Sequence, residues 1–277
     1  MKIGIIGTGN MGTILIESLI ESKAVKASDL VIINRPHDKA NRIKKRYPDI
    51  HIADEINEVG QRCQFIFICV KPFQIFPLLQ EMKEVLNEEK VIISITSPIS
   101  VEELENATNC QVARMIPSIT NRALSGCTLI TYGKRITEEN KQKLYELSSL
   151  FSNPFEISEQ YTRAASDIVS CGPAFFSYLL QRFIDGAVKQ TDIPKDLAVE
   201  LTNNMLIGFA KLIENNYYSL ETLQEKVTVK GGITGIGIEV LKTRIGDTFD
   251  ELFKETQRKF AEDRRGIIEQ FYNHLQS

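Results

Sequence analysis

Six residues near the start of the chain have the types and spacing of a phosphate-binding turn. The GxGxxG pattern Gly7-Thr8-Gly9-Asn10-Met11-Gly12 follows an apolar run and opens a helical pattern. Here glycines permit a tight turn and close approach of the backbone to a pyrophosphate, while the helix N-terminus offers N–H groups to the phosphates. The pattern therefore predicts a dinucleotide site formed by Gly7, Thr8, Gly9, Asn10, Met11 and Gly12.

The end of the second apolar run indicates which dinucleotide is bound. It reads Ile32-Ile33-Asn34-Arg35, where sites that prefer NAD carry an acidic residue for the ribose hydroxyls. A guanidinium forks onto phosphate oxygens, whereas a carboxylate repels them. We therefore expect Asn34 and Arg35 to hold the 2′-phosphate of NADPH, with NADH as a second cofactor that the site could accept. The alternative is that Arg35 is only a surface residue.

A glycine pair late in the chain has the features of an anion site. Gly231 and Gly232 precede Ile233, Thr234 and a helix-like stretch from Ile236 to Ile245. Two glycines before a helix can form a nest of backbone N–H groups suited to a carboxylate. The alternative is a Gly-Gly hinge between two helices.

Histidines and cysteines form no catalytic or metal-binding pattern. The three histidines, His37, His51 and His274, occupy no motif, so a histidine-based dehydrogenase relay has no candidate. No HExxH or comparable cluster occurs, and no metal is predicted. The five cysteines lack CxxC spacing and are expected to be buried, reduced thiols. Cys171 precedes a helix, where thiol pKa values fall, yet no reactive role is expected for it.

Short apolar runs separated by helix-like segments must position these residues. Most runs are apolar on successive residues, which is typical of parallel strands covered on both faces. The pattern therefore predicts a doubly wound sheet up to about residue 157. Its expected strands are Ile3 to Ile6, Leu30 to Ile33, Phe65 to Val70, Val91 to Ile95, Val112 to Ile116 and Leu129 to Thr131.

From about Tyr161 the period becomes helical, and no strand candidate follows. The sequence thus predicts a Rossmann domain, residues 1–158, followed by an all-helical domain, residues 159–277. Apolar residues recur at helical spacing from Phe176 to Ala187 and again from Leu197 to Leu212. With little else to cover them, these faces are expected to be buried in a homodimer or a higher homo-oligomer.

Composition excludes several classes of partner. The 277 residues carry a net charge of -3, which provides no basic field for nucleic acid. No apolar run approaches the roughly 20 residues that span a bilayer. Because residues 1–7 already read as a strand and a turn, no signal peptide is expected, and we predict a cytoplasmic protein without membrane contact.

Taken together, the motifs resemble those of the pyrroline-5-carboxylate reductases over essentially the whole chain. The blocks that carry the resemblance occur in that family's order and spacing. They are Gly7 to Gly12, Asn34-Arg35, Val70-Lys71-Pro72, Arg114-Met115-Ile116-Pro117, Cys171-Gly172-Pro173-Ala174, Asp185-Gly186-Ala187-Val188 and Gly231-Gly232-Ile233-Thr234.

The resemblance implies the reduction of Δ1-pyrroline-5-carboxylate to L-proline by NAD(P)H, in a site between the Rossmann domain and helices of a dimer. It implies that Val70, Lys71 and Pro72 border the nicotinamide ribose. Lys230, Gly231, Gly232 and Ile233 would bind the small imino acid substrate, and the Thr234 hydroxyl would form a hydrogen bond with the ring nitrogen. Little acid-base machinery is needed, because a protonated cyclic imine is already electrophilic.

Four segments depart from the family pattern. The family has Ser-Pro before the glycine pair, where this chain has Val229-Lys230. Ser118-Ile119-Thr120 replaces Asn-Thr-Pro, Ser97-Pro98-Ile99 replaces Ala-Gly-Ile, and Val169-Ser170-Cys171 replaces Ser-Gly-Ser. These changes suit a divergent member, such as the reductase-like proteins encoded beside competence operons.

Two other functions remain open. The first is a catalytically weak NADP-binding regulator, which the unaltered glycine loop and altered substrate loop would fit. The second is an oxidoreductase for C=O bonds related to the 3-hydroxyacid dehydrogenases, which needs a lysine on the first long helix of the second domain. Lys189 is the only lysine there.

Overall fold

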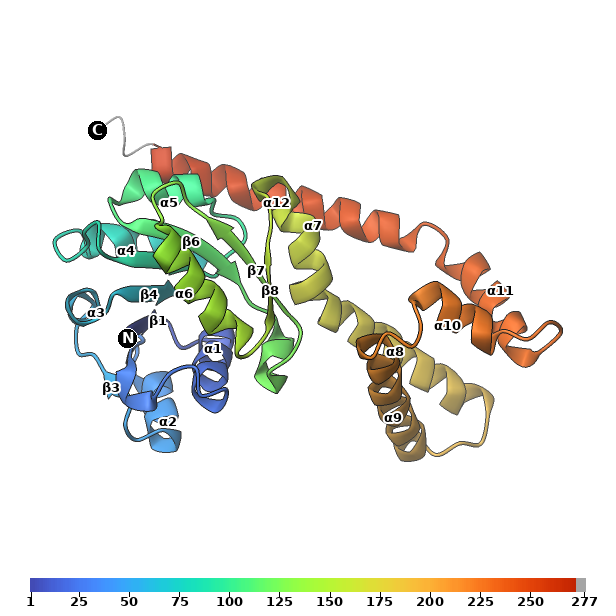
Figure 1. The fold of residues 1–277 in the computed structure, drawn as a ribbon. Helices are drawn as coiled ribbons and strands as arrows, with labels where there is room; N and C mark the ends of the chain where they lie inside the picture. The colour runs from blue at the N-terminus through green and yellow to red at the C-terminus, as the bar shows by residue number, and fades with distance from the viewer. Residues whose placement is uncertain (273–277) are drawn as a thin grey trace. The chain divides into compact units, whose positions relative to one another are not determined.

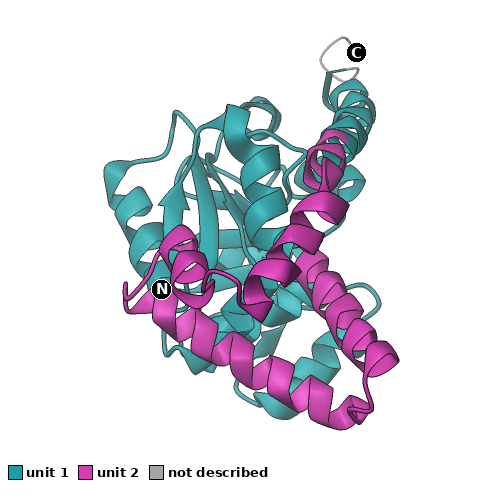
Figure 2. Cartoon of the chain, turned by 90° about the vertical axis from the view of Figure 1, so that its right-hand side faces the viewer, with its two compact units in different colours: residues 1–173, 255–277 teal, residues 174–254 magenta. Residues whose placement is uncertain are grey.

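The computed structural model describes residues 1–272, so His274 and the last residues of the expected second domain lie outside the described part. Contacts divide the described chain into two compact units, residues 1–173 with 255–272 and residues 174–254 (Figure 2). The compact units divide after residues 173 and 254. The domain boundary expected after residue 158 is a division of another kind and stays a prediction.

The first unit is built on one eight-stranded sheet, in the order β3-β2-β1-β4-β5-β6-β7-β8. The first six strands are parallel and have the doubly wound Rossmann order, which confirms the expected fold class. The strands are β1 (Ile3–Ile6), β2 (Leu30–Ile33), β3 (His51–Ile52), β4 (Phe65–Ile68), β5 (Val91–Ser94), β6 (Gln111–Ile116), β7 (Cys127–Tyr132) and β8 (Asn153–Glu156).

The structure adds two strands to the six expected ones and reverses the direction of one. β3 has only two residues, which is too short for an apolar pattern, and β8 contains Pro154, which argues against a strand. Neither strand was therefore recognisable in the sequence. β7 runs antiparallel to β6, which corrects the expectation of an all-parallel sheet. Only a short 3₁₀ turn, Ile119–Ala123, joins these strands, and a parallel return would need a longer crossover.

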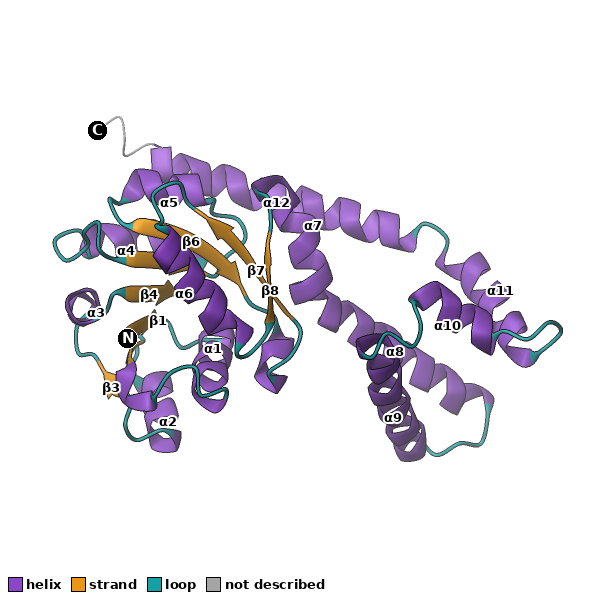
Figure 3. Cartoon of the chain, in the orientation of Figure 1, coloured by secondary structure: helices purple, strands orange, loops and turns teal. Residues whose placement is uncertain are grey.

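Helices cover both faces of the sheet (Figures 1 and 3). Alternate residues of the strands point to opposite faces, so Ile5 packs in one core and Ile6 in the other. The first core includes α1 (Asn10–Glu21), α2 (Asp38–Arg46) and α6 (Glu138–Ser149). The second includes α3 (Ile56–Arg62), α4 (Ile75–Glu81) and α5 (Val101–Ala107).

The end of the last helix, α12 (Thr248–Tyr272), packs with the second core. Ile267 and Phe271 are buried there, and the rings of Phe271 and Phe76 meet edge to face at 5.0 Å. Residues 255–272 therefore belong to the compact unit of the sheet, although the sequence places them after the helical domain has begun.

After β8, every regular element of the described residues is helical, as expected (Figure 3). A short helix, α7 (Thr162–Ser166), and a π-helical turn, Asp167–Cys171, lead into α8. The remaining helices are α8 (Gly172–Gln190), α9 (Lys195–Glu214), α10 (Leu220–Val227) and α11 (Ile233–Ile245). Among residues 1–272, no helix is both long enough and apolar enough to span a bilayer.

Candidate functional site

Three glycines shape the turn between β1 and α1. Gly7 has a φ of 100°, and a Cβ there would lie 2.6 Å from the Cys69 carbonyl oxygen. A Cβ on Gly12 would lie 2.1 Å from the Gly7 carbonyl oxygen, so only glycine allows helix and turn to pack this closely. A Cβ on Gly9 would meet nothing within 4 Å, which leaves open space at the start of the helix.

That open space lies at a helix N-terminus able to bind an anion. Gly9 is the N-cap and provides no side chain to cap α1. The first helical hydrogen bond runs from the Thr13 N–H to the Gly9 carbonyl at 2.9 Å, so the N–H groups of Asn10, Met11 and Gly12 have no acceptor within the helix. These groups and the helix dipole favour a phosphate beside Gly9.

Asn34, directly after β2, fixes the glycine loop. Its side-chain oxygen accepts the Thr8 N–H at 2.9 Å, and its side-chain nitrogen donates to the Pro36 carbonyl at 2.8 Å. Both polar atoms of the amide thus already have backbone partners. Asn34 therefore positions the glycine loop.

A cavity of about 590 Å³ brings together residues from four parts of the chain, within 6–9, 33–39, 56 and 69–81. Of the eleven residues predicted to bind cofactor, its walls include Gly7, Gly9, Asn34, Arg35, Val70 and Lys71. Pro72 begins a short 3₁₀ turn beside this wall, and Thr8, Asn10, Met11 and Gly12 continue the loop. The other lining residues are Ile6, Ile33, Pro36, Lys39, Ile56, Cys69, Phe73, Gln74, Pro77, Leu78 and Glu81.

This cavity lies beyond the carboxyl ends of β1, β2 and β4. Because the strand order reverses between β1 and β4, it is at the switch point where doubly wound sheets bind their ligands. A larger cavity, about 790 Å³, lies among α4, α5 and the end of α12. It contains none of the predicted site residues.

The predicted substrate segment belongs to the second unit. Gly231 has a φ of 76°, and the Gly232 N–H donates to the Val229 carbonyl at 2.9 Å. Gly232 is the N-cap of α11, so the N–H groups of Ile233 and Thr234 fall in the first turn of that helix. Lys230 and Thr234 are exposed, and Ile233 is 90% exposed. The geometry is that of a nest open to an anion.

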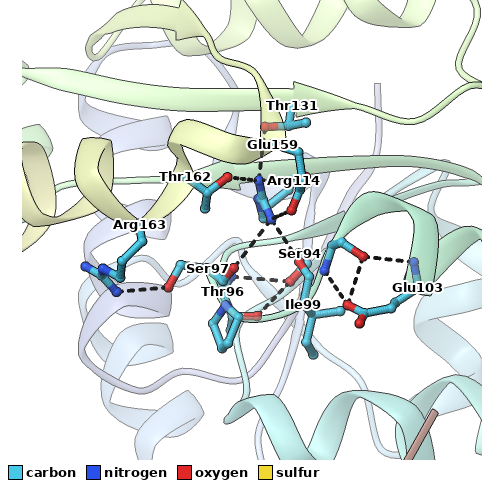
Figure 4. Close-up of polar contacts among 12 residues, drawn as sticks. Ser94, Thr96, Ser97, Ile99, Glu103, Arg114, Thr131, Glu159, Thr162 and Arg163 are labelled. Carbon is cyan, nitrogen blue, oxygen red and sulfur yellow. Dashed lines mark hydrogen bonds and ion pairs between the residues drawn. The ribbon is translucent and has the colours of Figure 1, made fainter. Parts of the chain in front are cut away.

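A polar cluster at the ends of β5 and β6 was missed by sequence reasoning (Figure 4). The Arg114 side chain is fully buried, and its guanidinium donates to Glu159 at 2.8 and 3.0 Å. It also donates to the Ile99 carbonyl and to the hydroxyls of Thr131 and Thr162. These bonds tie the loop after β5 to the segment that leads into α7. An arginine inside an otherwise apolar strand was the signal in the sequence.

Three of the four departures from the family pattern meet beside this cluster. The Ser118 hydroxyl donates to the Val169 carbonyl at 2.6 Å, and the Ser170 hydroxyl donates to the Pro117 carbonyl at 3.0 Å. Arg163 donates to the Ser97 hydroxyl and to the Cys171 sulfur, both at 3.4 Å. The three departing segments are therefore neighbours in space, joined directly or through Arg163.

The thiols have pKa values above their ordinary range. Burial raises the pKa of Cys63 to about 11 and that of Cys69 to about 12. Burial also raises the pKa of Cys171, although the nearby Arg163 guanidinium opposes this shift. Since the thiolate is the nucleophilic form, these thiols are poorly reactive at neutral pH. Among the described residues, no group of three or more His, Cys, Asp or Glu side chains is arranged to hold a metal.

Comparisons with known families match both parts of the chain. Residues 159–263 match a family described as pyrroline-5-carboxylate reductase dimerisation. Residues 2–98 match a family described as NADP oxidoreductase, coenzyme F420-dependent.

Two curated proteins from Bacillus subtilis (strain 168) resemble nearly the whole chain. ComE operon protein 4 is 50% identical over 98% of this chain and 100% of its own length. Pyrroline-5-carboxylate reductase 3 is 31% identical over 94% of this chain and 95% of its own length.

Solved structures share the fold. The pyrroline carboxylate reductase of Plasmodium falciparum, solved with NADP bound, has a TM-score of 0.82 and 20% identity, covering 96% of this chain and 98% of its own. The pyrroline-5-carboxylate reductase of Coxiella burnetii has the same TM-score, 21% identity and the same coverage.

Proposed function

Because this chain belongs to the pyrroline-5-carboxylate reductase family, we propose that it is an NADPH-dependent reductase of a cyclic imine, with Δ1-pyrroline-5-carboxylate as substrate and L-proline as product. The observation that carries the proposal is the cavity of about 590 Å³, in which the glycine loop, Arg35 and Lys71 meet. Oxidation of NADPH by the purified protein with this substrate is the direct test. Absence of turnover with both NADPH and NADH, in folded protein, contradicts the proposal.

The residues of the cavity fit the cofactor. The open space at Gly9 and the N–H groups of the first turn of α1 would receive the pyrophosphate. Arg35, with Lys39 nearby in the same wall, would receive the 2′-phosphate. When bound, the reduced nicotinamide supplies the hydride that the C=N carbon accepts. Val70, Lys71 and Pro72 would border its ribose.

The glycine segment before α11 would hold the substrate. The N–H groups of Ile233 and Thr234, in the first turn of α11, would receive the substrate carboxylate, and Lys230 adds an ammonium where the family has a proline. The Thr234 hydroxyl oxygen would accept a hydrogen bond from the protonated ring nitrogen. Because the protonated imine is already electrophilic, these residues need to orient it rather than transfer protons to it.

Assembly and location follow from the same family. The helical region corresponds to a dimerisation family, and its apolar faces are exposed in a single chain. We infer a homodimer or a higher homo-oligomer, located in the cytoplasm. Lys189, which a C=O oxidoreductase of the hydroxyacid type would need, lies exposed in the last turn of α8, and no described acidic or polar group is bonded to it to activate it for that role.

A catalytically weak NADP-binding regulator is the second candidate. The departures from the family pattern favour it, because they leave the cofactor loop intact. Ser97 and Cys171 both bond to Arg163, Ser118 bonds to the Val169 carbonyl, and Val229-Lys230 precede the glycine pair. Restoring the family residues in a Val229→Ser, Lys230→Pro variant separates the candidates. A large gain in turnover supports the weak regulator, and unchanged or lower turnover supports an active reductase with its own form of the loop.

A further inference from the structure

Arg35 has an ion-pair partner inside the candidate cofactor cavity. Its guanidinium lies 3.0 Å from a carboxylate oxygen of Glu81, the last residue of α4. The two residues are 46 positions apart and both line the cavity of about 590 Å³. The side chain assigned to the 2′-phosphate is therefore already bound to an anion of the protein itself.

The charges around the cavity make this pair unusual. Arg35, Lys39 and Lys71 supply positive charge, and Glu81 is the only acidic residue among those that line the cavity within residues 1–272. A carboxylate repels a phosphate placed beside it. The pair is also half-exposed, with side-chain exposures of 59% for Arg35 and 45% for Glu81, so it can exchange partners with ligands from solvent.

We propose that Glu81 is a specificity-determining residue, which lowers the preference of this chain for NADPH over NADH by competing with the ribose 2′-phosphate for Arg35. The proposal rests on the proposed function in that it takes this cavity as the cofactor site. Asn34 is uncharged and its amide already bonds two backbone groups, so Arg35 supplies the charge-assisted contact to a 2′-phosphate.

The two cofactors meet different situations at this pair. NADH carries only a hydroxyl at the ribose 2′ position, so the ion pair between Arg35 and Glu81 stays intact. The binding free energy of NADH therefore contains no cost for breaking this pair. NADPH must draw Arg35 away from Glu81 and leaves a carboxylate near its phosphate. Removing the charge of Glu81 therefore favours NADPH and changes NADH little.

The test is the dissociation constant of each cofactor, measured by calorimetry on the full-length protein without substrate. Glu81→Gln is expected to tighten NADPH by about threefold to tenfold and to change NADH by less than about twofold. The matched control is Glu139→Gln on α6, which removes the same charge from an exposed pair with Lys143, whose carboxylate and ammonium lie 2.6 Å apart. Circular dichroism checks that each variant is folded.

A double-mutant cycle tests the mechanism. If Glu81 acts mainly by holding Arg35, the gain in NADPH affinity from Glu81→Gln is much smaller once Arg35→Gln is present, because only the direct repulsion between carboxylate and phosphate remains to be removed. An equal effect of Glu81→Gln on both cofactors, no effect on either, or the same gain in the Arg35→Gln background overturns the inference. Failure of the proposed function is a separate result, namely no turnover with Δ1-pyrroline-5-carboxylate, and the cofactor dissociation constants do not depend on it. A wild-type protein that binds neither cofactor overturns both proposals.

Discussion

The sheet region and the helical region of this chain place their apolar side chains in different environments. In residues 1–173, strand residues such as Ile5 and Phe67 are completely buried between two layers of helices. In residues 174–254, Phe176, Phe183 and Leu201 are 59%, 64% and 54% exposed. Burial removes apolar surface from water at about 25 cal/mol per Å², so the first region is stabilised by its own chain. The second retains large apolar faces of the kind that a second subunit covers.

The two glycine loops differ in how tightly the surrounding structure packs against their glycines. The loop before α1 keeps the family pattern, and Gly7 and Gly12 are packed against backbone atoms that admit no side chain. In the loop before α11, a Cβ on Gly231 would meet nothing within 4 Å, and the two preceding residues depart from the family. Under the proposed function, cofactor binding depends on the tightly packed loop and turnover on the less constrained one, and the predictions test this difference.

The largest expected effect is that of Gly12→Ala. Its Cβ would collide with the Gly7 carbonyl at 2.1 Å, so the loop must move and the N–H groups of α1 lose their alignment. We expect NADPH affinity to fall at least about 100-fold, as two hydrogen bonds to a charged group are lost. Gly208→Ala on α9, whose Cβ meets nothing within 4 Å in its own chain, is the control and should bind NADPH normally. Calorimetry measures both, and unchanged affinity in Gly12→Ala refutes the loop assignment.

Phe183→Glu on α8 tests the exposed apolar face of the helical region. If a second subunit covers this face, the substitution buries the charge of the new glutamate in the interface. Because a central apolar contact contributes about 2 kcal/mol or more, the dimer dissociation constant should rise more than about 30-fold. The control is Tyr145→Glu on α6, because Tyr145 is 47% exposed but belongs to the sheet region. This variant should assemble like the wild type. Sedimentation velocity over a range of concentrations measures the effect. A Phe183→Glu protein that assembles like the wild type places the interface elsewhere.

Thr234→Ala tests whether the loop before α11 acts in turnover and not in cofactor binding. Loss of one hydrogen bond to a charged imine nitrogen should lower kcat by about tenfold to 100-fold, while the dissociation constant of NADPH stays the same. The control is Thr243→Ala on the same helix, whose hydroxyl donates to the Glu239 carbonyl of that helix at 2.8 Å. Equal losses in both variants would point to α11 stability instead of substrate contact.

The smallest expected effect concerns the surface of the sheet region. Hydrogen bonds from Arg62 and then His51, at 2.7 and 2.6 Å, lower the pKa of Glu58 from 4.5 to about 2. Because the folded-state pKa is depressed, this stabilisation is present above about pH 4.5 and is lost as the pH falls toward 2. Glu58→Gln should cost about 1 kcal/mol at pH 7 and nothing near pH 2. Urea unfolding at both pH values measures it, and an equal cost at both excludes the ionic explanation.

Much of the candidate site could be predicted because its signals are local. The glycine loop, the residues after β2 and the segment before α11 are each short stretches whose spacing has a direct backbone consequence. Arg114 was present in a recognised motif, but its six contacts to Ser97, Ile99, Thr131, Glu159 and Thr162 join segments up to 48 residues apart. No periodicity in the sequence reports such contacts.

The sequence by itself determined the succession of strands and helices, because hydrophobic periodicity and turn residues act over a few positions. Only the tertiary structure decided the direction of β7, the pairing of β3 and β8, and the packing of Ile267 and Phe271 with the sheet. It also decided that Asn34 binds the glycine loop and that Arg35 meets Glu81. These features depend on which distant segments become neighbours, and that is settled by the burial of the whole core rather than by any local pattern.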